Sequence, residues 1–300
     1  MLRIFHSDRY VPALPEGHRF PIGKYQLIRE QLLFEGSARE EQLIESEPVA
    51  EADILRAHHP VYWQKVRDLG LSPREARKTG FPQSSSLVDR SRRSVQGTLS
   101  AALSALEHGA GMNIAGGTHH AYAQHGEGFC LLNDFAITAH HLLHHRLVNQ
   151  ILIVDLDVHQ GNGNAHIFQD EKRVFTFSMH GQDNYPLRKE SSDLDIGLPK
   201  DTDDNAYLAL LQQTLPKLIN QVRPDIIFFQ AGVDVLATDT LGKLALSRQG
   251  CRQRDEILLS HCHERQIPVV VAMGGGYSAR LVDTVEAHSN TFRTALDMFG

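Results

Sequence analysis

The segment ILIVDLDVHQGNG, residues 151–163, combines two patterns that together indicate the fold. Residues 151–154 form a continuous apolar run, which is typical of a strand buried on both faces of a parallel sheet. Two carboxylates and an imidazole follow immediately, at the carboxyl end of the predicted strand, where open α/β sheets place their ligands. The segment therefore predicts an α/β protein with a polar site at this edge of its sheet.

Two further apolar runs, residues 226–229 and 269–272, predict buried parallel strands of the same kind. Helical spacing and stop signals predict helices at residues 91–106, 206–222, 252–265 and 280–299. The polar segment 78–96 is interpreted as a surface loop leading into a helix rather than as a domain boundary. We therefore expect one domain, residues 1–300, with an open, mainly parallel sheet flanked by helices.

Composition narrows the class of protein. The chain has 300 residues, 41% hydrophobic and 22% charged, with a formal net charge of −6, as in ordinary soluble proteins. This charge predicts no general attraction to nucleic acid or anionic membranes. Three cysteines without a CxxC pair argue against disulfides, and the apolar runs are too short for a signal peptide or a membrane span. We expect a soluble, reduced, cytoplasmic protein.

Polar clusters follow the predicted strands. In DLDVH, Asp157 and His159 share one side of an extended segment and suit zinc, iron or a similar divalent ion, whereas Asp155 could instead orient a neighbouring group. Upstream, GGTHHA brings the adjacent histidines His119 and His120, either as a surface pair or in a loop that reaches inward. The two segments predict a metal site with histidines beside it.

Two later clusters complete the set. AGVD at residues 231–234 supplies a third metal-type ligand, Asp234, which leaves positions open for water and substrate, as in a catalytic metal site. GGGY at 274–277 delivers one phenol, Tyr277, from a glycine run. These are the parts of a metal-assisted hydrolase, in which a histidine removes a proton from water and the tyrosine stabilises the oxyanion.

Five motifs in this order resemble those of the zinc-dependent histone deacetylase family: GGTHHA, GEGFCLLND, DLDVHQGNG, AGVDVLATDTLG and GGGY. The resemblance extends from about His6 to the C-terminus. HQGNG, HRFPIGKY and the short length are most similar to the class IV branch and its bacterial relatives. The family implies an arginase/deacetylase-like fold and hydrolysis of acylated lysine side chains or related amines.

The resemblance also implies roles for particular residues. Asp157, His159 and Asp234 match the Zn²⁺ ligands, for which Fe²⁺ is an alternative, and Tyr277 matches the tyrosine that polarises the acyl carbonyl. The catalytic histidines match His119, oriented by Asp155, and His120, oriented by Asn162. The walls of the acyl-lysine tunnel match Gly128 and Phe129, with Tyr185 and Leu241 as candidates for the other side. A structural K⁺ site matches Asp155, Asp157, His159, Ser178 and Met179.

Two departures from the family pattern lie in the same segment. Gln160 stands where many relatives have a second histidine, and Asn162 stands where class I members have aspartate. Asparagine can support His120 only by hydrogen bonding, so this imidazole should remain neutral more readily. The tract HHLLHHR at 140–146 matches no family role and is interpreted as a solvated helix face.

The resulting hypothesis is hydrolysis of an N-acyl-lysine, or of a similar small acylated amine, with His119 as the expected base and His120 as the expected acid. The alternatives are an acetylpolyamine deacetylase, a binuclear manganese ureohydrolase and a non-catalytic protein that binds acyl-lysine. The ureohydrolase would need more carboxylate ligands than the chain supplies, and the non-catalytic alternative leaves the complete ligand set unexplained. The expected partner is an acylated lysine or amine. The sequence leaves the oligomeric state open.

Overall fold

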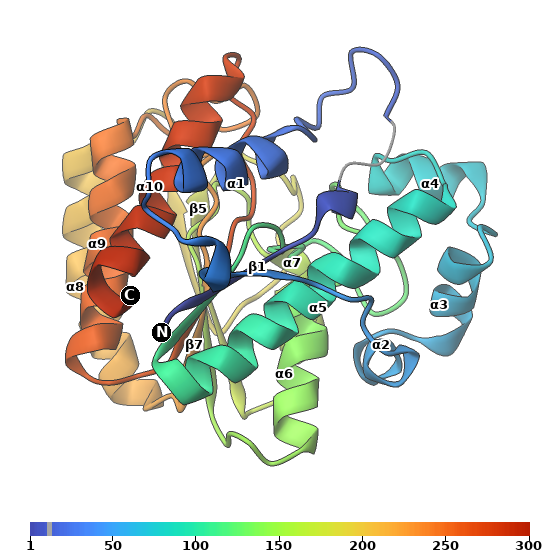
Figure 1. The fold of residues 1–300 in the computed structure, drawn as a ribbon, viewed down its shortest axis with the longest axis horizontal. Helices are drawn as coiled ribbons and strands as arrows, with labels where there is room; N and C mark the ends of the chain where they lie inside the picture. The colour runs from blue at the N-terminus through green and yellow to red at the C-terminus, as the bar shows by residue number, and fades with distance from the viewer. Residues whose placement is uncertain (11–13) are drawn as a thin grey trace.

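A computed structural model describes residues 1–10 and 14–300. The chain forms one sheet of eight strands in the order β2-β1-β3-β8-β7-β4-β5-β6, and every neighbouring pair is parallel. The sheet runs through the middle of the molecule, with helices on either side (Figure 1). The strands are β1 (Arg3–His6), β2 (Leu43–Glu45), β3 (Ala110–Asn113), β4 (Ile151–Asp155), β5 (Val174–Gly181), β6 (Leu194–Leu198), β7 (Ile226–Gln230) and β8 (Val269–Ala272). The predicted open parallel sheet is confirmed.

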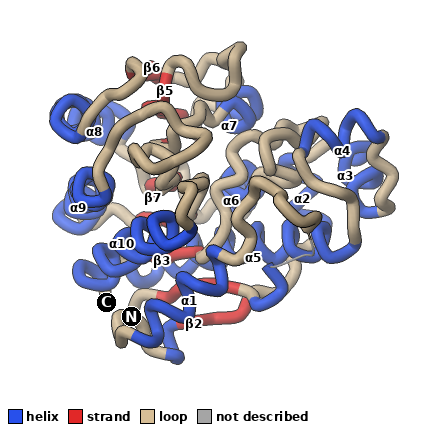
Figure 2. Tube along the Cα trace, turned by 90° about the horizontal axis from the view of Figure 1, so that it is seen from above, coloured by secondary structure: helices blue, strands red, loops and turns tan. Residues whose placement is uncertain are grey.

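Helices cover both faces of this sheet. The helices are α1 (Lys24–Phe34), α2 (Glu51–Ala57), α3 (Pro60–Arg67), α4 (Pro73–Thr79), α5 (Ser85–His108), α6 (Asp134–His144), α7 (Asn162–Phe168), α8 (Asp204–Val222), α9 (Arg248–Glu264) and α10 (Leu281–Phe299). Figure 2 shows α8, α9 and α10 on one face and α5, α6 and α7 on the other, with α2, α3 and α4 beyond them. This double covering explains why the central strands are apolar without alternation.

The predicted strands at 151–154, 226–229 and 269–272 are confirmed, and each lies in the centre of the sheet with every residue buried. The helices predicted at 206–222, 252–265 and 280–299 are confirmed to within a few residues at either end. The helix predicted at 91–106 also exists, but it extends over Ser85–His108 and is capped by Gly109 in a left-handed conformation.

The interpretation of residues 78–96 as a surface loop is wrong. The side chain of Ser84 accepts a hydrogen bond from the main-chain N–H of Leu87 and starts α5 there, so most of the segment is helical. The polar residues of this segment suggested exposure to solvent, but tertiary contacts bury several of them. Arg93, for example, donates to the main-chain oxygen of Ser46 at 2.7 Å and is 8% exposed.

The sheet order brings distant parts of the chain to one edge. β4 lies between β5 and β7, and Asp155, its last residue, is in register with Ser178 and with Gln230. β8 and β3 follow on the far side of β7. The loops after β3, β4, β7 and β8 therefore meet above the same edge, although they are more than 150 residues apart in sequence at the extremes.

Two smaller expectations concern the covalent state and the membrane. Cys130, Cys251 and Cys262 are buried free thiols, as the spacing predicted. No helix in the described ranges has the length and apolar character needed to cross a bilayer. Residues 11–13 of the predicted domain lie outside the described part of the chain.

Candidate metal and acid-base site

Three predicted ligands meet at the carboxyl edge of the sheet. Asp157 and His159 lie in the loop that follows β4, and Asp234 lies in the loop that follows β7. Nδ1 of His159 lies 3.1 Å from Oδ1 of Asp157 and 3.1 Å from Oδ2 of Asp234. One donor atom from each residue falls within 4.8 Å of the others. The structure therefore brings the three predicted ligands together in one cluster.

The charges of this cluster fit a divalent cation. All three side chains are buried, and buried carboxylates need a positive partner. Burial disfavours the charged imidazole, but hydrogen bonds to Asp157 and Asp234 outweigh it and raise the pKa of His159 to about 10. Burial and the charge of Asp157 raise the pKa of Asp234 to about 7. The carboxylates thus compete for one positive charge at the point where a metal ion would bind.

The glycine run before Tyr277 provides space for these carboxylates. The main-chain N–H of Gly275 donates to Oδ2 of Asp157 at 2.8 Å. A Cβ atom on Gly275 would overlap the carboxylate of Asp234 and would lie 2.9 Å from the same Asp157 oxygen. Only glycine therefore fits at this position, because any side chain would collide with the carboxylates.

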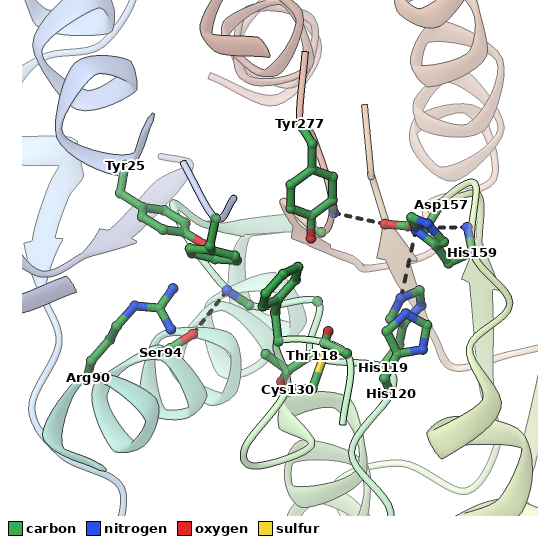
Figure 3. Close-up of a pocket in the computed structure, with 17 residues that line it drawn as sticks. Tyr25, Arg90, Ser94, Thr118, His119, His120, Cys130, Asp157, His159 and Tyr277 are labelled. Carbon is green, nitrogen blue, oxygen red and sulfur yellow. Dashed lines mark hydrogen bonds and ion pairs between the residues drawn. The ribbon is translucent and has the colours of Figure 1, made fainter. Parts of the chain in front are cut away.

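Both histidines of GGTHHA point inward, so the interpretation as a surface pair is wrong (Figure 3). Nδ1 of His119 donates to Oδ2 of Asp155 at 2.7 Å. Burial disfavours the imidazolium, but the charges of Asp155 and Asp157 raise the pKa of His119 to about 9. Asp155 therefore lies where the sequence placed it as a support for His119.

His120 has a different environment. Its ring lies 4.0 Å from that of His119, centroid to centroid, and its Nδ1 lies 2.6 Å from Oδ1 of Asn162. Burial and the nearby charges of His119 and His159 lower the pKa of His120 well below its usual value. The pKa values of the two adjacent imidazoles are therefore shifted in opposite directions, because carboxylates lie beside His119, whereas burial and positive neighbours dominate at His120, whose partner is an amide.

Glu127 controls the amide of Asn162, and sequence reasoning missed this residue. Oε1 of Glu127 accepts from Nδ2 of Asn162 at 2.7 Å and from the hydroxyl of Tyr185 at 2.7 Å. Hydrogen bonds from His125 and Lys78 help to outweigh burial and hold the pKa of Glu127 below its usual range. A buried glutamate inside the GEGFC motif was the available signal, but its partners come from other segments.

Tyr277 lies across the cavity from the histidines (Figure 3). Burial and the charges of Asp234 and Asp157 raise its pKa well above the usual value, so its hydroxyl keeps the proton. The carboxylate of Asp239, a residue that sequence reasoning missed, accepts from the main-chain N–H of Tyr277 at 2.6 Å. The buried Lys24, also missed, donates to the main-chain oxygen of Gly274 at 3.2 Å.

The four predicted tunnel residues border one cavity of about 420 Å³, which His120, His159 and Tyr277 also line. They are Gly128, Phe129, Tyr185 and Leu241. The Tyr185 ring stands perpendicular to that of His120, with centroids 5.0 Å apart. A Cβ on Gly128, whose φ is +57°, would lie 2.6 Å from the His120 ring. Glycine thus lets the tunnel wall approach the histidine closely.

The residues predicted to bind K⁺ also lie together. Ser178 is the register partner of Asp155 on the neighbouring strand, and its hydroxyl lies 2.9 Å from Nδ1 of His180. Met179 follows it in β5. Within residues 1–10 and 14–300, no hydrogen bond reaches the main-chain oxygens of Asp157 and His159, both in buried residues. Such oxygens fit a monovalent cation.

Residues that hold the GGTHH loop were missed as well. The carboxylate of Asp134 accepts from the main-chain N–H groups of Gly117 at 2.9 Å and Thr118 at 2.8 Å. Asn133 accepts from the N–H of Ala136 as the cap of α6 and donates to the main-chain oxygen of Ala121 at 2.9 Å. The cap of one helix therefore positions the histidine loop.

The histidine tract at 140–146 is only partly solvated. Nδ1 of His141 lies 2.8 Å from the carboxylate of Asp53 in α2, and a donor atom of His145 falls within 4.8 Å of both. Asp53 is shared with Arg56 at 3.1 Å, which already supplies a cation. The group around Asp157 differs from this one because all its members are buried.

The sheet order, the covering helices and the edge site define an α/β protein of the arginase/deacetylase fold class. A crystal structure of the HDA15 HD domain has this fold: it matches with a TM-score of 0.83 at 20% identity, over 99% of this chain and 88% of that one.

Sequence comparison gives the family. The histone deacetylase domain matches residues 18–292. Histone deacetylase 2 of Arabidopsis thaliana is 30% identical over 282 residues, which are 90% of this chain and 73% of that protein. An uncharacterized protein of Picosynechococcus sp. is 44% identical over 296 residues, 99% of this chain and 98% of that one. The chain belongs to the histone deacetylase family.

Proposed function

We propose that this chain is a metal-dependent deacylase that removes acetyl or longer acyl groups from lysine side chains, with residues 1–300 as one catalytic domain. One observation carries the proposal: Asp157, His159 and Tyr277 face a single cavity together with the two inward-pointing histidines. The chemistry needs a Lewis acid, a proton acceptor and an oxyanion donor within reach of one carbonyl, and these residues supply or hold all three.

Asp157, His159 and Asp234 would hold Zn²⁺, or Fe²⁺ as the alternative, and the ion would supply Lewis acidity toward the acyl carbonyl and toward water. The main-chain oxygens around Asp157 and the hydroxyl of Ser178 would hold a structural K⁺. Gln160 and Asn162 favour the class IV branch within the family. Composition alone supports a cytoplasmic location.

The pKa directions favour the reverse of the expected division between the histidines. The lowered pKa of His120 favours a neutral ring that can accept a proton, whereas the pKa of His119, raised to about 9 beside Asp155, favours the protonated ring. We assign His120 as the base toward water, and His119 as the group that stabilises developing negative charge and returns a proton to the leaving amine. The Tyr277 hydroxyl would donate a hydrogen bond to the oxyanion.

The test combines metal analysis with turnover. Protein purified without added metal is stripped with a chelator and reconstituted with Zn²⁺ or Fe²⁺ at one equivalent. Each form is then assayed on acetyl-lysine and longer acyl-lysine peptides with uncharged flanks, and on an acetylpolyamine. We expect release of carboxylate from the peptides only in the reconstituted forms. Stoichiometric binding of acyl-lysine peptides without turnover in any metal form would instead support a non-catalytic binding protein.

A further inference from the structure

The mouth of the predicted tunnel is strongly cationic. The cavity of about 420 Å³ above the site is lined by Arg19, Arg77, Lys78 and Lys243, against one exposed carboxylate, Asp183. The whole chain has a net charge of −6, so the sign at the mouth is the reverse of the overall sign. Clefts lined by one sign of charge select and steer ligands of the opposite sign.

Most of this positive charge is uncompensated. In the part of the chain that the structure describes, no ion pair joins Arg19, Arg77 or Lys243 to a carboxylate, and the three masked residues contain no acid. Lys78 differs, because its Nζ lies 2.6 Å from Oε2 of Glu127. Lys243 donates to the main-chain oxygen of Asp183 at 2.8 Å, a contact that leaves its charge in place.

The cations come from three separate segments around one opening. Arg19 precedes α1, Arg77 lies near the end of α4, and Lys243 lies in the loop between β7 and α9. His120, His159 and Tyr277 line the inner wall of the same cavity. A substrate whose acyl group reaches the site must therefore place the rest of its chain beside this cationic rim.

We infer that the preferred substrate is an acyl-lysine whose flanking residues in a peptide or protein are acidic. This inference rests on the proposed function and names its substrate class. Amines that bring further positive charges to the mouth, such as acylated polyamines and lysine-rich tails, are repelled by the same rim. Rim charges act mainly on encounter and specificity, so the preference falls as salt screens them over about 8 Å at physiological ionic strength.

The experiment uses three peptides that share a central acetyl-lysine and differ only in their flanks: two aspartates on each side, two serines, or two lysines. Their kcat/KM values are measured with the metal-reconstituted full chain at low and high salt, beside an acetylpolyamine. We expect the acidic-flank peptide to exceed the lysine-flank peptide by at least tenfold at low salt, and by about threefold or less in 1 M salt.

A charge-reversal pair locates the effect. In Arg77→Glu/Lys243→Glu the ratio between acidic and basic peptides should fall to within about twofold of one. The matched control Lys172→Glu/Lys217→Glu changes the net charge equally at exposed positions near the amino edge of the sheet, and it should keep the wild-type ratio.

The outcomes separate the two proposals. Equal rates for all flanks at low salt, or the highest rate for acetylpolyamine, would overturn the substrate inference while turnover of the serine-flank peptide upholds the proposed function. If no peptide is hydrolysed, the proposed function fails, and fluorescence anisotropy with the same labelled peptides then tests the charge preference directly. If the ratio between acidic and basic peptides also falls in the control Lys172→Glu/Lys217→Glu, the overall charge of the chain determines the preference, and the tunnel mouth does not.

Discussion

The amide oxygen of Asn162 lies 2.6 Å from Nδ1 of His120. The amide group of Asn162 cannot flip, because its nitrogen donates to a carboxylate oxygen of Glu127 at 2.7 Å and to the hydroxyl of Tyr122 at 3.0 Å. His120 must therefore donate from Nδ1, which leaves Nε2 unprotonated in the neutral ring. Glu127 thus determines the tautomer of His120 through Asn162, without a hydrogen bond of its own to the histidine.

Asn162→Asp should reduce activity in this chain, although class I members of the family carry aspartate at the matching position. The new carboxylate would lie beside Glu127, and like charges at this distance cannot both remain ionised without cost. We expect kcat to fall by about a hundredfold, by the usual scale for a misdirected acid-base group. Steady-state kinetics over a pH series would measure it.

Glu127→Gln supplies the second arm of a double-mutant cycle. Alone it removes the acceptor that holds Asn162, and kcat should fall about tenfold with little change in KM. In the double variant Asn162→Asp/Glu127→Gln, the new amide can donate to the new carboxylate. The double variant should be more active than Asn162→Asp. Strictly additive losses would mean that Glu127 and Asn162 do not act as one unit.

Tyr277→Phe should keep its metal and lose most turnover. Removal of one oxyanion donor costs about 10²–10³ in kcat in comparable sites. Metal content by mass spectrometry and single-turnover rates would measure the two effects separately. Wild-type rates in this variant would remove Tyr277 from the mechanism.

Asp234→Ala should lose both the metal and the activity. The substitution takes away one of three buried donors and leaves Asp157 and His159 as an incomplete set. Zinc content after dialysis should fall from about one equivalent to near zero. Asp170→Ala, at an exposed position, is the control and should retain zinc. Full zinc occupancy in Asp234→Ala would overturn the ligand assignment.

Gly275→Ala tests the steric role of the glycine run. The added Cβ would overlap the carboxylate of Asp234, so we expect weaker zinc binding by about tenfold or more, measured by chelator competition. Gly23→Ala is the control, because φ is −68° there and a Cβ would meet nothing within 4 Å. Unchanged affinity in Gly275→Ala would show that the loop can move aside.

His58→Gln should reduce the acid sensitivity of the fold. His58 is buried and accepts the main-chain N–H of Asn133 at 2.9 Å, and burial lowers its pKa from 6.5 to about 4. Only the unfolded chain takes up this proton as the pH falls from 6.5 toward 4. Stability present above pH 6.5 is therefore lost over that range, by on the order of 3 kcal/mol.

Urea unfolding at pH 7.5 and pH 4.5 measures this loss. The difference in free energy of unfolding between the two pH values should be smaller in His58→Gln than in the wild type, whatever the absolute stability of the variant. Parallel pH dependence in both proteins would contradict the assignment to His58.

The three central strands and the place of the site could be predicted because they depend on local patterns, whereas the order of the eight strands is seen only in the tertiary structure. Buried parallel strands read as apolar runs, and Asp157 and Asp234 each follow such a run directly. The boundary of α5 could not be predicted, because its polar residues are buried by partners that lie about 40 residues away or more, such as Ser46 beside Arg93.

The residue types and their spacing were sufficient to predict that the candidate ligands, the paired histidines and the tyrosine gather at one site, since metal binding and acid-base chemistry each need particular donor atoms. The different environments of the two histidines are visible only in the tertiary structure. Burial and partner charge set each pKa, and the partners of His119 and His120 lie 36 and 42 residues away in sequence. The cationic mouth likewise exists only because folding gathers Arg19, Arg77 and Lys243 from separate segments around one opening.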